Sequence, residues 1–243
     1  MEVHHHPEVE KKNFKQYLLE GLMIFLAVTM GFFAEGLRER ISAKEREKQY
    51  IESLENNLNK DKSDLAYFIR ENKKKVSGLD SLLSLYDKDL SNPANRKLMY
   101  IYSQYISMVS IFSSNDATMT QLKNSGGLQF IKHGHVADSI AKYDQEMRGI
   151  FAADVPYTKF TSDATEAMTE MFVFNLNKDT VSKQGAGKEI FPLLSYNPHQ
   201  IQVFFNKIKL ERGWTQNYVK NLEERVPYNN KLIALLKNEY DLE

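Results

Sequence analysis

The chain has 243 residues, of which 42% are hydrophobic and 26% are charged, a composition typical of a folded protein. Lys+Arg and Asp+Glu both number 32, and this zero net charge argues against a nucleic-acid partner, which needs a broad positive field. The absence of cysteine excludes disulfides, thiolate metal sites and cysteine nucleophiles. Only 11 Gly and 6 Pro predict few turns and long helices, hence an all-α fold.

An apolar run extends from Leu18 to Leu37 and is interrupted only by Glu20 and Glu35. Twenty helical residues rise about 30 Å, which is the hydrocarbon thickness of a bilayer. The run therefore predicts a transmembrane anchor over residues 18–37, after a short tail over 1–17 and before a soluble helical domain over 38–243. A buried core helix and an interfacial or signal segment are the alternatives.

The orientation of the anchor is predicted from its flanks. Lys11, Lys12 and Lys15 precede it, whereas five basic residues follow it, at positions 38, 40, 44, 46 and 48. More basic residues follow the run than precede it, so the positive-inside rule alone would place the C-terminal side in the cytoplasm. Long domains, however, translocate largely regardless of flanking charge. A short basic tail before an apolar run is also how a signal anchor begins. We expect a single pass through a bacterial inner membrane, with a cytoplasmic N-terminus and a periplasmic domain.

One face of the anchor carries Glu20, Ile24, Ala27, Gly31 and Glu35 at three- to four-residue spacing. Ala27 and Gly31 form a small-xxx-small pair, which allows two helix backbones to approach closely in lipid. This stripe predicts packing against another helix, from a second copy or from a partner protein. The alternative is that both glutamates simply reach the headgroup regions.

Two histidine groups are candidate metal ligands. His4, His5 and His6 are adjacent and could chelate a transition metal, although a solvated tail without metal is the simpler interpretation. His133 and His135 lie near Asp138, but no fourth ligand is close in sequence, which favours a structural or solvated role. No cofactor is expected.

The sequence of the predicted soluble domain indicates a series of helices. The stretch from Leu37 to Ser77 lacks Gly and Pro and predicts one long helix, bent near Gly78 and reaching Tyr86. Ser91-Asn92-Pro93 predicts a second start, followed by an apolar face that continues to Phe112. A short helix over 117–124 should stop at Ser125, Gly126 and Gly127. Further helices are expected over 135–147 and from Val155-Pro156 to Phe172, before a polar loop over 175–188.

The C-terminal segment alternates spacings of four and three, which is a heptad ladder with Pro227 as a kink or break. The ladder could form the seam of an intramolecular antiparallel bundle. Alternatively it could form an intermolecular coiled coil whose register Arg212 and Asn229 would fix. Its positions are Ile201, Phe205, Ile208, Arg212, Thr215, Val219, Leu222, Val226, Asn229, Ile233, Leu236 and Tyr240.

The stretch ATMTQLKNSGGLQFIKHGHVADSIAKYDQEM, residues 117–147, resembles a family of uncharacterised membrane-anchored proteins of Bacteroidota. The matching positions are Thr118 or Thr120, Leu122, Lys123, Ser125, Gly126, Leu128, Ile131, Lys132 and Tyr143. The N-terminal run over residues 4–35 is similar to the anchor of such proteins. The resemblance covers about a third of the chain and implies an anchored, non-cytoplasmic helical domain, with no activity to transfer.

These features favour a non-enzymatic membrane protein that serves as a scaffold or as an accessory subunit of an envelope complex. No Ser-His-Asp set, HExxH helix or nucleotide loop is recognisable, so we expect no catalysis. The expected partners are the membrane and either a protein partner or a second copy, through the anchor and the heptads. The alternative function is a periplasmic helical bundle that senses a ligand and signals through a partner.

Overall fold

The computed structural model describes residues 13–174 and 191–242, and within these ranges the chain is helical throughout, apart from connecting segments and one isolated β-bridge. The chain divides into two compact units, residues 1–49 and residues 50–243. The tail with His4, His5 and His6 and the predicted loop over 175–188 lie outside the described residues.

The first unit contains the N-terminal part of helix α1 (Phe14–Leu83), which carries the apolar run. This part of α1 is long and apolar enough to cross a membrane, and none of its most apolar window is buried. Phe32 and Phe33 are each 76% exposed. Thr29 donates its hydroxyl proton to the carbonyl of Phe25 at 2.7 Å, so this side chain is satisfied within the helix.

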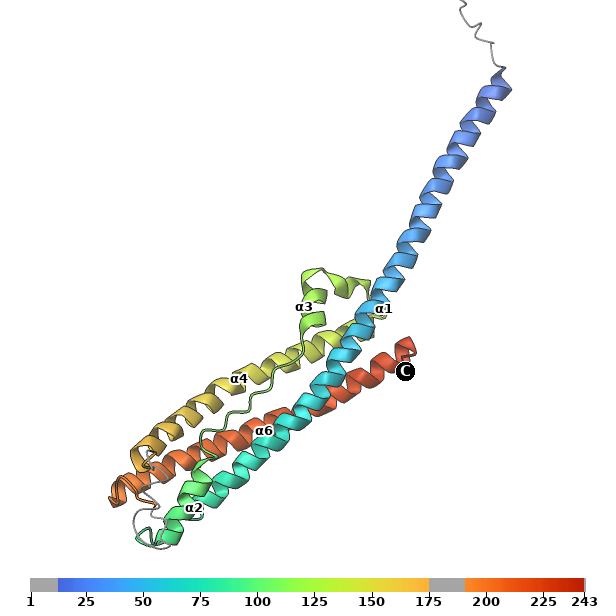
Figure 1. Ribbon diagram of the computed structural model, residues 1–243. Helices are drawn as coiled ribbons and strands as arrows, with labels where there is room; N and C mark the ends of the chain where they lie inside the picture. Colours follow the sequence, from blue (N-terminus) through green and yellow to red (C-terminus); the bar gives the residue numbers. More distant parts are fainter. Residues whose placement is uncertain (1–12, 175–190, 243) are drawn as a thin grey trace, which may run out of the picture. The chain divides into compact units, whose positions relative to one another are not determined.

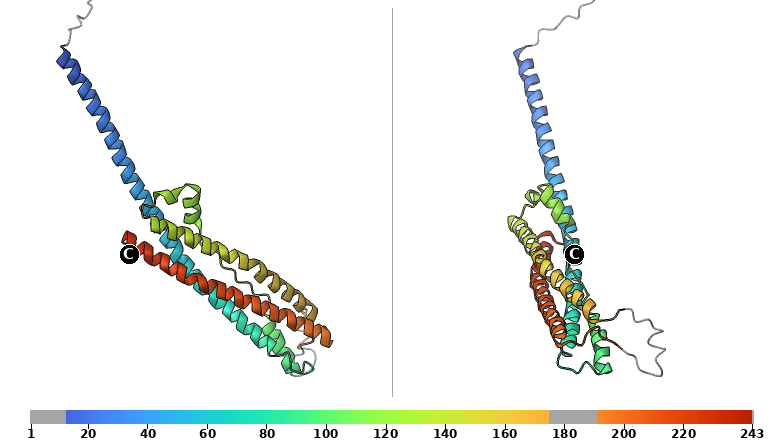
Figure 2. Two further views of the ribbon diagram at one scale, coloured as in Figure 1. Left: turned by 180° about the vertical axis from the view of Figure 1, so that it is seen from behind. Right: turned by 90° about the vertical axis from the view of Figure 1, so that its left-hand side faces the viewer.

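The second unit is a bundle of three long helices. The C-terminal part of α1, α4 (Gly134–Met171) and α6 (Pro198–Tyr240) run side by side (Figures 1 and 2). Their apolar faces meet in two buried clusters, one around Leu58, Ile140 and Leu222 and the other around Leu79, Ala164 and Ile208. Helices α2 (Pro93–Ser103) and α3 (Ala117–Asn124) and a 3-10 turn, η1 (Gly127–Phe130), connect α1 to α4. The predicted all-α fold, with a long first helix followed by packed helices, is confirmed.

Pro156 and Pro227, predicted to interrupt helices, lie inside continuous helices. The expected separate helices over 135–147 and 156–172 are one helix, α4, which runs through Pro156, and α6 runs through Pro227. Proline removes one internal hydrogen bond, but burial of one face over ten turns outweighs that loss. Helix α1 continues through Gly78, as predicted, and ends at Leu83; the glycine provides room for the ring of Tyr105.

The second predicted helix is shorter than its apolar pattern implied. Helix α2 ends at Ser103, and residues 108–116 form an extended segment without secondary structure, which we call the strap. Val109 and Phe112, expected on a helix face, lie on the strap, where Phe112 is buried and Val109 is 52% exposed. Figure 1 shows the strap leading from α2 to α3 along the bundle.

The C-terminal heptads pack within the chain, as the intramolecular alternative predicted. Phe205, Ile208, Val219, Leu222 and Leu236 are buried in the bundle core. One heptad position differs from the prediction: Arg212 is partly exposed and pairs with Asp80, whereas its neighbour Glu211 is fully buried. The helix face turned inward is therefore shifted by one residue at this point.

Candidate functional site

The bundle holds the strap by its main chain, through polar side chains that reach it from the long helices. Two of them come from α1: Lys75 donates to the carbonyl of Met108 at 2.6 Å, and Asn72 donates to the carbonyl of Ser110 at 2.8 Å. Asn72 and Lys75 are 0% and 1% exposed. They therefore satisfy carbonyl groups that could not otherwise be buried without penalty.

Two tyrosine hydroxyls complete this recognition from the other helices. The hydroxyl of Tyr157 on α4 accepts from the N–H of Ser110 at 3.2 Å and donates to Asn72 at 2.9 Å. The hydroxyl of Tyr218 on α6 accepts from the N–H of Phe112 at 3.0 Å. The two rings stack with centroids 4.6 Å apart. Burial raises the pKa of Tyr157 to about 12 and also raises the pKa of Tyr218, so both remain protonated at neutral pH.

A buried ion pair lies beneath the same segment. Lys75 Nζ is 2.8 Å from Glu211 Oε1 and donates to Thr161 Oγ1 at 2.9 Å, and both charged side chains are at most 1% exposed. With Met108, Lys75 therefore has three acceptors, one for each ammonium proton. Burial lowers the pKa of Lys75 and raises the pKa of Glu211 to about 7, while the attraction within the pair opposes both shifts.

A second polar centre holds the C-terminal end of the strap. Asp61 on α1 is 1% exposed and accepts from the hydroxyl of Ser114 and the N–H of Asn115, each at 2.6 Å. Tyr143 on α4 also donates to Asp61 at 2.7 Å, and Asn229 on α6 donates to the Tyr143 oxygen at 3.1 Å. Burial, with the charge of Asp61 next in importance, strongly raises the pKa of Tyr143. This centre therefore joins all three long helices to the strap.

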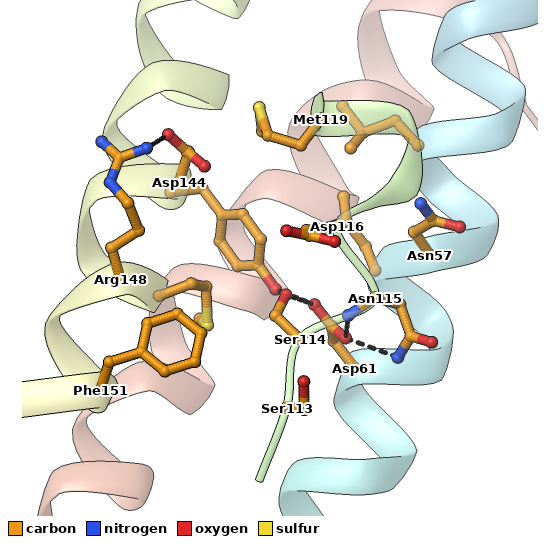
Figure 3. Close-up of a pocket in the computed structure, with 14 residues that line it drawn as sticks. Asn57, Asp61, Ser113, Ser114, Asn115, Asp116, Met119, Asp144, Arg148 and Phe151 are labelled. Atoms are coloured by element: carbon orange, nitrogen blue, oxygen red, sulfur yellow. Dashed lines mark hydrogen bonds and ion pairs between the residues drawn. The ribbon is translucent and has the colours of Figure 1, made fainter. Parts of the chain in front are cut away.

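A pocket of about 80 Å³ opens beside this second centre (Figure 3). The end of the strap and α1 form one side of it, and α4 contributes Asp144, Arg148 and Phe151. Asp144 is paired with Arg148 and with Lys123, the latter at 3.0 Å. The apolar lining comes from Leu54, Leu58, Met119, Met147 and Phe151.

The four residues on the predicted packing face of the apolar run all belong to the first unit. Glu20, Ala27, Gly31 and Glu35 are exposed. A Cβ atom added at Gly31 would meet nothing within 4 Å among the described residues. Glu35 accepts from Arg38 at 2.6 Å.

The proposed helix stop lies where α3 ends. Ser125 follows the last residue of α3, and Gly126 adopts a left-handed conformation with φ 66°. A Cβ atom at Gly127 would be 2.8 Å from the end of the Leu122 side chain and 3.2 Å from its Cα, so a side chain there would displace Leu122.

His133 and His135 both face Glu239 near the end of α6. Their ring nitrogens lie 3.6 Å and 3.3 Å from the two carboxylate oxygens. Among the described residues, no group of three His, Asp or Glu side chains has the arrangement of a metal site. The two histidines therefore belong to a surface contact between the ends of α4 and α6.

Sequence reasoning missed Asp61, Asn72, Lys75 and Glu211. A signal was present, because Asp61 and Asn72 continue the three- to four-residue apolar spacing of Leu54, Leu58, Leu65 and Phe68. A polar residue in a buried register is a candidate for an internal contact. The partners of these residues could not be identified, since they come from the strap and from helices more than 30 positions away.

The fold and the site define an all-helical bundle with one apolar, unburied helical segment and an extended strap bound by buried polar groups. No protein-family model, no curated protein and no solved structure matches this chain significantly.

Proposed function

We propose that the protein is a non-enzymatic, single-pass membrane protein whose helical bundle serves as a scaffold or accessory subunit of an envelope complex. One observation carries the proposal: the apolar run of α1 is unburied over its whole length. The run contains fourteen apolar side chains. Leaving them in water would be very unfavourable, so a bilayer is the natural environment for this segment.

The buried polar groups support a structural role for the bundle. Lys75, Asn72, Tyr157 and Tyr218 are directed at the chain's own strap rather than at an open cleft. Groups used in this way stabilise one arrangement of the helices and present a defined surface to a partner. The proposed topology has a cytoplasmic N-terminus and a periplasmic bundle.

The topology can be tested with single cysteines, because the chain has none of its own. A Tyr67→Cys variant places a thiol at an exposed site of the bundle, since Tyr67 is 48% exposed. We expect a membrane-impermeant maleimide to label it in intact inner-membrane spheroplasts. A Lys15→Cys variant, on the other side of the anchor, should be labelled only after the membrane is permeabilised. The reverse pattern would show a cytoplasmic bundle.

The partner can be sought by extracting the tagged protein from its native membrane in mild detergent. We expect a heteromeric complex of defined mass. Replacing Ala27 and Gly31 by Leu should reduce recovery of the partner if their helix face is the contact. Replacing Phe25 and Phe33 by Leu, on the opposite face, is the matched control. Unchanged recovery in the first variant would remove the anchor from the interface.

The pocket beside Asp61 favours a second candidate, a ligand-sensing bundle that signals through a partner. If this candidate is correct, a small molecule should raise the unfolding temperature of the protein. An Asp61→Asn variant should lose that response. Recovery of the protein alone, as a monomer or homo-oligomer, would favour self-assembly or ligand sensing over a stable heteromeric complex.

A further inference from the structure

The chain that leaves α2 carries a helical pattern that the structure does not use. In a helical projection one side of it is polar, with Ser103, Ser107, Ser110 and Ser114 at spacings of four, three and four. The opposite side is apolar, with Tyr105, Val109 and Phe112. Positions 106, 109 and 111 are nevertheless β-branched, which suits an extended chain. The residues from 104 to 112 therefore fit two conformations.

The end of α2 has no local stop signal. Gln104, the residue after the helix, is still in the right-handed helical conformation, with φ −58° and ψ −23°. The N–H groups of Tyr105 and Ile106 donate to the carbonyls three residues before them, at 3.1 Å and 3.0 Å, so a tighter helical turn follows α2. From residue 94 to residue 125 the sequence contains neither Gly nor Pro. Nothing in the local sequence prevents α2 from continuing.

The extended conformation of the strap is imposed by the bundle. Its main chain is bonded by Lys75 and Asn72 of α1, by Tyr157 of α4 and by Tyr218 of α6. These bonds replace those that Met108, Ser110 and Phe112 would form within a helix. Because they come from three helices, a displacement of any one helix against the other two breaks some of them. The balance between the two conformations is thus set by the packing of the bundle.

A change to the helical conformation would reach the second polar centre. Residues 108–112 span about 17 Å when extended and about 8 Å when helical. The chain would shorten by about 9 Å, which draws Ser114 and Asn115 away from Asp61. Ser114 and Asn115 also line the pocket beside Asp61, so the same change removes one side of that pocket (Figure 3).

We propose that residues 104–112 are a two-state element of the fold, either extended and bonded to the three long helices or helical as a continuation of α2. In the helical state, Asp61 and its pocket are uncovered. The element converts a displacement among the long helices into a change at the pocket. This inference goes beyond the proposed function and holds for a scaffold and for a sensor alike.

Position 109 allows the two states to be biased separately. Val109 is 52% exposed, and within the described part of the chain no hydrogen bond reaches its main chain. Val109→Ala favours the helical state, because alanine is the better helix former. Val109→Pro is compatible with an extended chain but forbids the helix. Val109→Thr is the matched control, since threonine is β-branched and has a helix propensity close to that of valine.

The measurement is carbon-13 saturation-transfer NMR on the full chain in detergent micelles, observed at the Cα atoms of Met108 and Ile111. The background is Tyr218→Phe, which removes the hydroxyl that binds the N–H of Phe112. We expect a minor state with helical Cα shifts, about tenfold more populated than in the wild type, which corresponds to one hydrogen bond. Val109→Ala should raise its population a further two- to threefold over Val109→Thr, by about the difference in helix propensity. Val109→Pro should abolish it.

A minor state with random-coil shifts, or one that persists unchanged in Val109→Pro, would overturn the proposal, because the released strap would then be disordered. No exchange in Val109→Ala would overturn it as well. Fluorescence of Trp214, the only tryptophan, shows that each variant is folded. If Tyr218→Phe does not fold, the same three Val109 variants in the wild-type background give the same comparison.

Discussion

Lys75 of α1 and Glu211 of α6 form an ion pair, 2.8 Å long, between two side chains that are almost completely buried. The pair couples two long helices and the strap, because Lys75 also binds the carbonyl of Met108. A buried charge is tolerated only with a partner, and each member of this pair therefore depends on the other.

Removing one partner should be more harmful than removing both. We expect Lys75→Met to lower the free energy of unfolding by about 3–5 kcal/mol, because it leaves Glu211 buried without its cation. The double variant Lys75→Met with Glu211→Leu should recover much of this loss. Denaturant titrations followed by Trp214 fluorescence give the values, since Trp214 is the only tryptophan and stacks on Phe160. Additive losses would show that the two residues are not coupled.

The same pair predicts a dependence of stability on pH. Burial raises the pKa of Glu211 from 4.5 to about 7, so between these values the folded state binds more protons than the unfolded state. The contribution of Glu211 is therefore greatest below pH 4.5 and is lost as the pH rises towards 7, by up to about 3 kcal/mol. The contribution of Lys75 to stability changes with pH in the opposite direction. Because its pKa is lowered in the folded state, stability rises as the pH increases from that lowered pKa to 10.5.

The measurement compares the wild type with Glu211→Gln between pH 5 and pH 7. Tyr157, Tyr218 and Asp154 lie in the same environment and remain in both proteins. The difference between the two curves thus reports the titration of Glu211 together with its effect on the pKa of Lys75. A variant curve parallel to that of the wild type would contradict the raised pKa.

Asp61 should stabilise the C-terminal end of the strap in particular. In Asp61→Asn, one of the two oxygens becomes an NH₂ group that faces donors such as Ser114 and Asn115. We expect a loss of about 2–4 kcal/mol, and faster hydrogen exchange concentrated in residues 112–124. Ser114→Ala, which removes one donor only, is the milder control. Uniform acceleration across α6 as well would indicate global destabilisation instead.

Gly78 should not tolerate a side chain. A Cβ atom there would overlap the ring of Tyr105. Gly78→Ala should lower stability by about 1–3 kcal/mol, despite alanine being the better helix former. Combining it with Tyr105→Ala should restore much of the loss, as measured by denaturation. Gly213→Ala is the control, because no atom lies within 4 Å of its added Cβ among the described residues.

The sequence determined the helical class, the apolar segment long enough to cross a membrane, and the start and end of several elements. The long apolar run needs no tertiary contact to be recognised, since its length and composition alone match a bilayer. Asn92-Pro93 and Ser125-Gly126 mark the start of α2 and the end of α3 because their conformational preferences are local.

Only the tertiary structure decided the course of the strap and the buried polar contacts. Leu98, Tyr102, Tyr105, Val109 and Phe112 have helical spacing, yet the helix ends at Ser103 and, after a turn over 104–107, the chain is extended from Met108. Lys75, Asn72, Tyr157 and Tyr218 offer it hydrogen bonds that replace those of a helix. Prolines 156 and 227 remain inside helices for a related reason: the burial of a long apolar face outweighs a local preference. Local propensities act over a few residues, whereas these contacts join residues 33 to 106 positions apart, and sequence spacing alone does not encode such distances.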